Sequence, residues 1–308
     1  MRAFCISLIV LTSSLSAAAL EERFAQEVPT QEVTNSNIHG FLEFRVKNDY
    51  VTPRGLYVTN TGVTTQTLLG LAFDVYKNPE QFINNVSIFG FIWNDFWSKQ
   101  HHKTAGAWNE LDWGFGTNVT FAKHCTFGVQ FIEFVSPPGN FKPEKNIEFT
   151  LAYDDSYRQF PIAFKPYAKL FWAVTGDSTV VVGKRGHTYD VELGLVPTWD
   201  LHKYDVNLVL SLPTWITTGP ANFWNGGKLG LKNERAKFGV VSTGLRGEVA
   251  INFIPKSFGN WYLDVGCQYY HMINDNLLQA QTVTLGVRSL DRAHRNVYVA
   301  YAGIGLRF

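Results

Sequence analysis

The sequence predicts an all-β protein, a transmembrane antiparallel up-and-down β-barrel of about 12 strands. Three observations support this fold class: an unusual composition, a repeated twofold alternation of apolar and polar residues, and an alternation of long and short connections. Of the 308 residues, 17% are charged, 15% are aromatic and 26 are glycine. This composition excludes a disordered chain. The formal net charge of +1 lacks the basic excess of a nucleic-acid binder, so no nucleic-acid partner is expected.

The N-terminal residues 1–19 are predicted to be a secretory signal peptide. Arg2 precedes the apolar stretch 4–11, and three alanines at 17–19 precede the expected cleavage site. Residues 20–36 are then a periplasmic N-terminal segment, and 37–308 form the barrel. The longest uncharged stretch elsewhere, 206–227, contains two prolines and three glycines and does not suit a membrane helix. A membrane protein of this kind must cross with strands.

Apolar residues recur at every second position in almost every predicted strand, as expected where the two faces of a strand meet different surroundings. In chain order, the apolar positions are even in 37–47, odd in 65–76, undecided in 85–94, and odd in 109–121, 125–135 and 145–153. They are then even in 163–174, odd in 188–196, even in 204–212, odd in 239–253 and 261–270, and even in 297–308. Strand 85–94 is apolar at both parities and cannot be oriented from the sequence.

A soluble β-sandwich also alternates, so further features are needed to favour a membrane barrel. The polar faces carry charged residues between glycines, as in a water-filled lumen. Aromatic residues near strand ends suit the membrane interfaces: Tyr153, Tyr189, Tyr204, Trp261 and Tyr298. Long connections after odd-numbered strands alternate with short ones, such as the turn at 122–124, which is typical of outer-membrane barrels.

The C-terminal strand carries a second signal. Counting back from the terminal residue, alternate positions are apolar and share one face: Phe308, Leu306, Ile304, Ala302, Ala300 and Tyr298. This pattern resembles the barrel-assembly signal of Gram-negative outer-membrane porins. The resemblance implies an outer-membrane location after cleavage of the signal peptide. It also implies contact with the barrel-assembly machinery, membrane lipid and lipopolysaccharide.

A narrower resemblance lies at the end of the first strand. Asn48-Asp49-Tyr50 is followed by Arg54-Gly55, which is similar to the opening of the TorF-like porins. This likeness covers about 20 residues and the final strand. It implies a small porin-like channel and carries over no catalytic residue.

The inward parities together predict the lining of the lumen. The acidic side chains are Glu43, Asp74, Glu110, Asp112, Glu148, Asp190, Glu192, Asp205, Glu248 and Asp264, and the basic ones are Arg45, Lys47, Lys165, Lys169, Arg246 and Arg307. Rings of charge select permeant ions by sign, so an excess of acids favours cations. The sequence therefore predicts a channel for passive diffusion of small hydrophilic solutes, modestly favouring cations. Alternatively, the charged residues form a network of cross-strand ion pairs that stabilises the barrel wall. The barrel itself is alternatively structural or adhesive, with a plugged lumen.

An outer-membrane barrel enzyme is a further alternative, but no sequence feature supports it, and no cofactor or metal site is predicted. Some barrel phospholipases place His and Ser two residues apart, but none of the eight histidines has Ser at the second following position. The His101–His102 pair is interpreted as solvated loop residues. Loop 213–237, rich in aromatic and basic residues, either folds into the pore, binds a ligand, or lies near lipopolysaccharide phosphates.

The two cysteines of the mature chain are expected to stay unpaired. Cys125 and Cys267 lie six strands apart in a ring of twelve, too far for a disulfide. Both share the apolar parity of their strands and are expected to face lipid.

Overall fold

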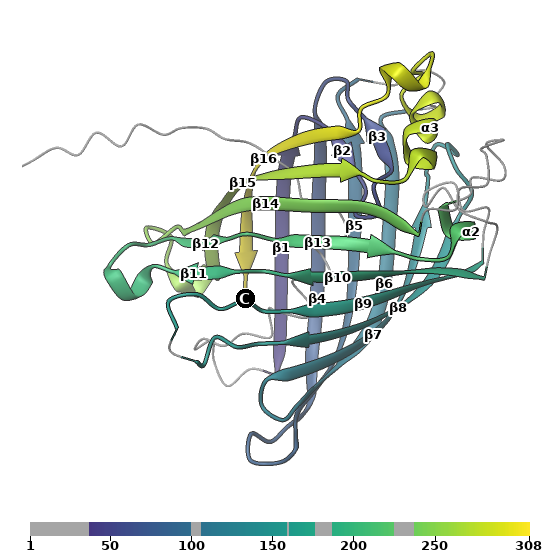
Figure 1. Cartoon of the computed structure of the whole chain (residues 1–308). Coiled ribbons are helices and arrows are strands. Elements are labelled where there is room, and N and C mark those ends of the chain that lie inside the picture. Colours follow the sequence, from purple (N-terminus) through teal and green to yellow (C-terminus); the bar gives the residue numbers. More distant parts are fainter. Residues whose placement is uncertain (1–36, 100–105, 159, 176–186, 225–236) are drawn as a thin grey trace, which may run out of the picture.

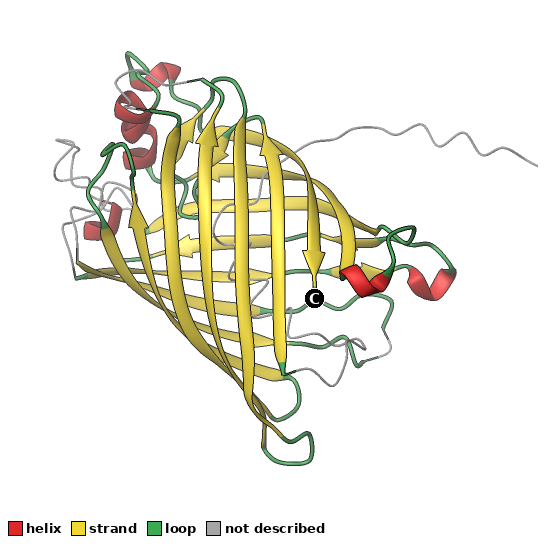
Figure 2. Ribbon diagram, turned by 180° about the vertical axis from the view of Figure 1, so that it is seen from behind, coloured by secondary structure: helices red, strands yellow, loops and turns green. Residues whose placement is uncertain are grey.

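The computed structural model describes residues 37–99, 106–158, 160–175, 187–224 and 237–308, which form a closed antiparallel β-barrel (Figures 1 and 2). The predicted signal peptide, the segment 20–36 and the His101–His102 pair lie outside these residues. The long strands are β1 (Ile38–Lys47), β4 (Thr64–Lys77), β5 (Ile83–Trp97), β6 (Trp108–Phe121), β7 (Cys125–Val135), β8 (Glu144–Tyr153), β9 (Tyr167–Thr175), β10 (Thr188–Leu195), β13 (Thr214–Thr218), β14 (Phe238–Ala250), β15 (Asn260–Met272) and β16 (Asn296–Arg307). The predicted 12-strand ring is confirmed.

The ring closes where the first strand meets the last. β1 pairs with β16 in antiparallel register from Phe41 opposite Arg307 to Lys47 opposite Tyr301. Every other long strand pairs with its neighbour in the chain, so the topology is up-and-down throughout. Closure leaves no open sheet edge, which is the condition for crossing a bilayer with strands.

The two faces of each strand have opposite chemistry, and the outer one is apolar. On β1, Leu42 and Phe44 are each 43% exposed, whereas the intervening Glu43 is 3% exposed. β5, which the sequence could not orient, places Trp93 inside the barrel and Ile92 outside. Apolar side chains outside and charged ones inside are the reverse of a soluble protein and suit a lipid environment.

Two of the predicted strands differ most from the observed ones, whereas the other bounds agree within three residues. The prediction of a strand at 204–212 is wrong, because a 3-10 turn, η1 (His202–Tyr204), leads into Asp205 with a left-handed φ of 59°. The strand is instead β12 (Val209–Ser211) followed by β13, interrupted at Pro213, which has no N–H for the ladder. β12 also pairs with the short β11 (Thr198–Asp200). β9 begins at residue 167 rather than 163, after Lys165 with a φ of 45° and Pro166.

The connections divide the barrel into two ends. At the loop end, successive strands are separated in the sequence by 48–63, 98–107, 136–143, 176–187, 219–237 and 273–295. At the turn end, they are separated by 78–82, 122–124, 154–166, 196–208 and 251–259. The loop end carries α2 (Ala221–Trp224), α3 (Asp275–Thr284) and η3 (Leu290–Arg292), and the turn end carries η1 and η2 (Lys256–Phe258). The connections 154–166 and 196–208 are longer than predicted because the neighbouring strands start later. In the described part of the chain, no helix has the length and apolar character needed to cross a membrane.

The first loop contains a small hairpin that turns into the barrel. β2 (Tyr50–Val51) and β3 (Tyr57–Thr59) form a two-stranded sheet separate from the barrel sheet. The tip is closed by a hydrogen bond of 2.9 Å from the Gly55 N–H to the Thr52 carbonyl. Gly55 has a φ of +91° and packs closely against Val240 and Leu277, so this position requires glycine.

The two cysteines are free, as predicted. β7 and β15 lie six places apart in the ring order, which confirms the predicted separation of Cys125 and Cys267. Each cysteine shares the parity of exposed apolar neighbours on its strand, Phe127 and Val265 respectively.

Candidate functional site: the barrel lumen

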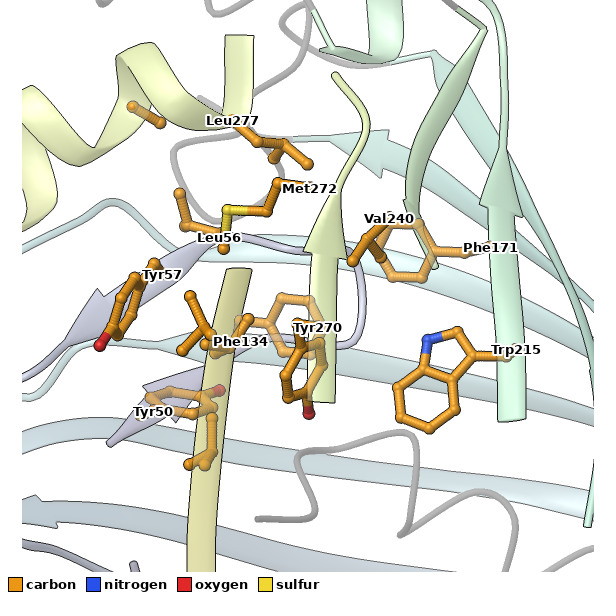
Figure 3. Close-up of a cluster of buried hydrophobic side chains, with 14 of the residues drawn as sticks. Tyr50, Leu56, Tyr57, Phe134, Phe171, Trp215, Val240, Tyr270, Met272 and Leu277 are labelled. Carbon is orange, nitrogen blue, oxygen red and sulfur yellow. The ribbon is translucent and has the colours of Figure 1, made fainter. Parts of the chain in front are cut away.

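The loop-end half of the lumen is filled by a continuous apolar cluster, here called the lumen core (Figure 3). Nine of the twelve long strands contribute buried residues to it, as do the hairpin, α2 and α3. Its members include Phe41, Leu68, Phe89, Phe91, Trp93, Ile132, Phe134, Phe171, Trp215, Val240, Tyr270, Met272, Val299, Tyr50, Val51, Leu56, Tyr57, Phe223 and Leu277. The hairpin therefore crosses a packed cross-section of the barrel.

The hairpin tip reaches the wall opposite its own root. Arg54 Nη2 donates a hydrogen bond of 3.0 Å to Glu148 Oε1 on β8, and its Nε donates one of 3.3 Å to Asp190 Oδ1 on β10. The guanidinium carbon lies 3.3 Å from the ring centroid of Phe171 on β9. Arg54, Glu148 and Asp190 are all buried. A charge-assisted contact of this kind compensates the desolvation of the three charges.

Further contacts secure the rest of the hairpin. The Tyr50 hydroxyl donates to Glu110 Oε2 at 3.3 Å, and its ring lies 5.8 Å from that of Trp93. The Trp215 indole N–H donates to the Pro53 carbonyl at 3.3 Å. At the root, burial raises the pKa of the Asp49 carboxyl, although the hydrogen bond from the Tyr57 hydroxyl lowers it in part. The hairpin is thus held from several strands, chiefly through side chains.

The α3 helix covers the hairpin from the loop end. Thr284 Oγ1 donates a hydrogen bond of 2.6 Å to the Tyr57 carbonyl, and Leu277 is buried in the lumen core. Asn274 caps the helix by accepting from the Asn276 N–H.

A network of ion pairs occupies the lumen wall formed by β1, β14, β15 and β16. Asp264 accepts hydrogen bonds of 2.9 Å from the Nε atoms of both Arg45 and Arg246. Arg45 also pairs with Glu43 at 2.9 Å, and Glu43 accepts from the Tyr262 hydroxyl. Glu248 completes the network, pairing with Arg246 and Arg307: N–O distances are 2.9 and 2.6 Å. This part of the wall therefore matches the alternative that the sequence left open, a network of ion pairs between strands.

The opposite wall is richer in acids. Asp95, Glu110, Asp112 and Glu144, here called the acidic cluster, line β5, β6 and β8 near the loop end. Asp95 accepts hydrogen bonds from Thr64, Gln66, Trp97 and Asn109. Glu110 accepts from Tyr50, and Asp112 Oδ1 is buried without a hydrogen-bond partner. Within the described part of the chain, no group of carboxylate, histidine or cysteine side chains is arranged to hold a metal ion.

Most of the predicted lining residues point into the barrel. The inward-facing ones are Glu43, Arg45, Lys47, Asp74, Glu110, Asp112, Glu148, Lys169, Asp190, Glu192, Arg246, Glu248, Asp264 and Arg307. Two do not belong to the lining: Lys165 lies in the connection before β9, and Asp205 lies in the exposed turn after η1. In both cases the left-handed backbone lies near the start of the predicted strand, and the observed strand begins after it.

Three inward-facing charges were not among the predicted lining residues. Asp95 was missed because the predicted strand 85–94, which could not be oriented, ended one residue before it. Glu144 was missed because the predicted strand 145–153 began one residue after it. Arg54 belongs to a loop, where alternation carries no information. The Pro-Arg-Gly sequence at 53–55 indicates a tight turn, but nothing in it indicates that the turn enters the lumen.

The described part of loop 213–237 faces the lumen. Trp215 lies on β13 and points inward, while Phe223 and Trp224 of α2 are buried; Phe223 meets Phe171 edge-on at 6.3 Å. Three of its four basic residues, Lys228, Lys232 and Arg235, lie outside the described residues, whereas Lys237 lies within them.

The four residues of the predicted assembly signal share the outer face of β16. Tyr298, Ile304 and Phe308 are exposed, and Leu306 is half-buried. The Phe308 ring lies over Gly40 of β1, where the absence of a side chain leaves room for it.

Comparison with known proteins bears on the fold. No family model matches the chain, and no curated protein sequence matches it. Among solved structures, an outer-membrane channel from Pseudomonas putida F1 is 10% identical with a TM-score of 0.53, covering 92% of this chain and 99% of its own. The protein shares the fold of an outer-membrane β-barrel channel.

Two other solved structures are less similar. The NanC porin is 10% identical with a TM-score of 0.46, covering 86% of this chain and 98% of its own. The outer membrane phospholipase A from Escherichia coli is 12% identical with a TM-score of 0.41, covering 87% and 92%. None of these comparisons shows the resemblance to TorF-like porins.

The ion-pair network gives a prediction about stability. Replacing Arg45 with Ala leaves two buried carboxylates short of a partner and is expected to lower the free energy of unfolding by about 3 kcal/mol. Lys145→Ala is the matched control: its pair with Glu133 is 3.9 Å long and Lys145 is 50% exposed, so about 0–1 kcal/mol is expected. Urea unfolding in lipid vesicles measures both, and equal losses would contradict the prediction.

Proposed function

We propose that the protein is an outer-membrane channel of a Gram-negative bacterium for passive diffusion of small hydrophilic solutes, modestly favouring cations. In the conformation described here, its lumen is closed by the β2–β3 hairpin. The observation that carries this proposal is that the hairpin forms a sheet of its own inside a charged barrel. It can leave the lumen without breaking any strand pairing of the wall. The fold shared with an outer-membrane channel supports the same function.

The lining supports the preference for cations. The structure removes Lys165 and Asp205 from the predicted set of lining residues and adds Asp95, Glu144 and Arg54. In the corrected set, acidic residues still outnumber basic ones. The bases of the ion-pair network are neutralised by carboxylates, and the acidic cluster adds four further carboxylates to the lining. An excess of carboxylates attracts cations into a pore. In this proposal the loop end faces lipopolysaccharide outside the cell and the turn end faces the periplasm.

A second candidate is a structural barrel whose lumen is permanently plugged. The burial of the hairpin favours it: Val51 is 0% exposed and Glu148 1%, so the packing around them is dense. The two functions differ in whether the lumen conducts once the hairpin is removed.

Removal of the hairpin tests the proposed function. A variant with residues 51–58 replaced by a short Gly-Ser linker is expected to fold and to conduct ions in planar bilayers with a larger unitary conductance than the wild type. The physical reason is that the hairpin provides the contacts that cross the lumen. Heat-modifiable gel mobility confirms folding. A folded variant without conductance would reject the channel and favour the plugged barrel.

The acidic cluster is expected to set ion selectivity. In the hairpin-deleted channel, replacing Glu110 with Gln and Asp112 with Asn lowers the preference for cations, because lumen substitutions alter the pore's charge more than its stability. The reversal potential under a salt gradient measures the change. Glu133→Gln, an acid on the outward face, is the control and leaves the reversal potential unchanged. An unaltered potential in the double variant would remove these residues from the pore.

We further propose that Tyr298, Ile304, Leu306 and Phe308 form the signal read by the barrel-assembly machinery. Their shared parity along β16 and the residue after it, with Tyr298, Ile304 and Phe308 exposed, supports this proposal. Phe308 also bonds β1 through its backbone, with an N–O distance of 3.0 Å to the Gly40 carbonyl.

Deletion of Phe308 is expected to lower the fraction of folded protein in the outer membrane. The deletion removes both the terminal aromatic and its contact with Gly40, so assembly and closure are weakened together. Membrane yield and heat-modifiable mobility measure the fraction, with Phe308→Tyr as the control that keeps an aromatic ring. Equal yields of the deletion variant and the wild type would count against the signal.

A further inference from the structure

We infer that Glu148, Phe171 and Asp190 form a binding site for solutes that carry a guanidinium group, and that the chain's own Arg54 occupies this site while the lumen is closed. The inference rests on the proposed function, because in the wild type a solute passing through the lumen reaches the site only when Arg54 leaves it. It names the chemical class of ligand that the channel recognises.

The three residues form one row across adjacent strands. Glu148 on β8 stands directly opposite Phe171 on β9, and Phe171 stands directly opposite Asp190 on β10. All three point inward and are buried. Two carboxylates therefore flank an aromatic ring at a single level of the wall, on strands that the barrel ladder holds rigidly in place.

The contacts of Arg54 show which chemistry this row accepts. Its guanidinium lies over the ring at 3.3 Å from the centroid, while two different nitrogens donate to the two carboxylates at 3.0 and 3.3 Å. A planar cation can stack on a ring and still donate from its edges in two directions. A compact ammonium group lacks that flat, forked arrangement. The row therefore favours guanidinium over ammonium.

The site is built independently of the hairpin. Gln130 Nε2 donates to Glu148 Oε2 at 3.3 Å, which orients the carboxylate from β7. Lys169, the neighbouring base, lies 3.6 Å from Glu192. When Arg54 leaves, two buried carboxylates remain without their main counter-charge. That state strongly favours the uptake of another cation of the same shape.

Arg54 and a solute compete for one position. The hairpin tethers Arg54 near the row, which gives it a high effective concentration, so a free solute binds weakly to the wild type. A solute that does take the site displaces the tip and frees the lumen. The site thus couples recognition of a guanidinium solute to opening.

Calorimetry on the full-length protein, folded in detergent micelles, tests the site with methylguanidinium as the probe. Arg54→Ala vacates the row and is expected to bind methylguanidinium at least about tenfold more tightly than the wild type. The triple variant R54A/E148Q/D190N is expected to lose this binding. Arg288→Ala removes an exposed arginine at the loop end and serves as the matched control, with the wild type's weak binding unchanged. Methylammonium in place of methylguanidinium is expected to bind Arg54→Ala more weakly.

Two results would overturn the inference: a folded Arg54→Ala variant that does not bind methylguanidinium, or a triple variant that binds it as well as Arg54→Ala. If Arg54→Ala does not fold, the wild type gives the test. The bilayer conductance of the wild type is then expected to be higher in a methylguanidinium salt than in a methylammonium salt of the same ionic strength. Equal conductance in the two salts would reject the site.

The outcome is separable from the proposed function. Binding to Arg54→Ala in a barrel whose hairpin-deleted form does not conduct would reject the channel and keep the site, whereas conductance of that form without binding would reject the site alone.

Discussion

The pairing of β1 with β16 is the constraint on which the rest of the structure depends. In a hydrocarbon environment an unpaired backbone N–H or carbonyl costs several kcal/mol, so a sheet that crosses it must close on itself. The register from Phe41 opposite Arg307 to Lys47 opposite Tyr301 achieves this. Once the ring is closed, the twofold alternation of side chains leaves each residue only one of two places, the lipid or the lumen. Charged residues are thereby forced together in a small interior.

The interior stabilises these charges in two different ways. Near β1 and β14–β16, acids and bases on the same strand or on strands one or two places apart neutralise one another, and Asp264 lies between two arginines. On β8 and β10, Glu148 and Asp190 have a counter-charge that comes from a loop, Arg54. The first solution is built into the wall and is permanent. The second depends on a hairpin outside the wall's hydrogen-bond ladder, so the same contact can both close the lumen and release it.

The sequence predicts the strands well where one face is polar and poorly where that contrast is missing. β7 spans Cys125–Val135, as the alternation at 125–135 indicates. The prediction fails at 204–212, because the alternation continues through a turn at Asp205, and Pro213 then interrupts a strand that resumes. Strand 85–94 is ambiguous for a related reason. Phe91 and Trp93 face inward yet are apolar, because they pack in the lumen core against the hairpin and helices rather than against water.

The sequence by itself determined the class of fold, the side of the wall on which most charges lie, and the separation of the two cysteines, because these follow from a local period of two residues. Only the tertiary structure decided that the first loop enters the lumen. Arg54 meets partners 94 and 136 residues away along the chain. No local pattern encodes such contacts, since a loop has no fixed period and its path is set by the surfaces it packs against. Which residues fill the lumen could therefore be determined only from the tertiary structure.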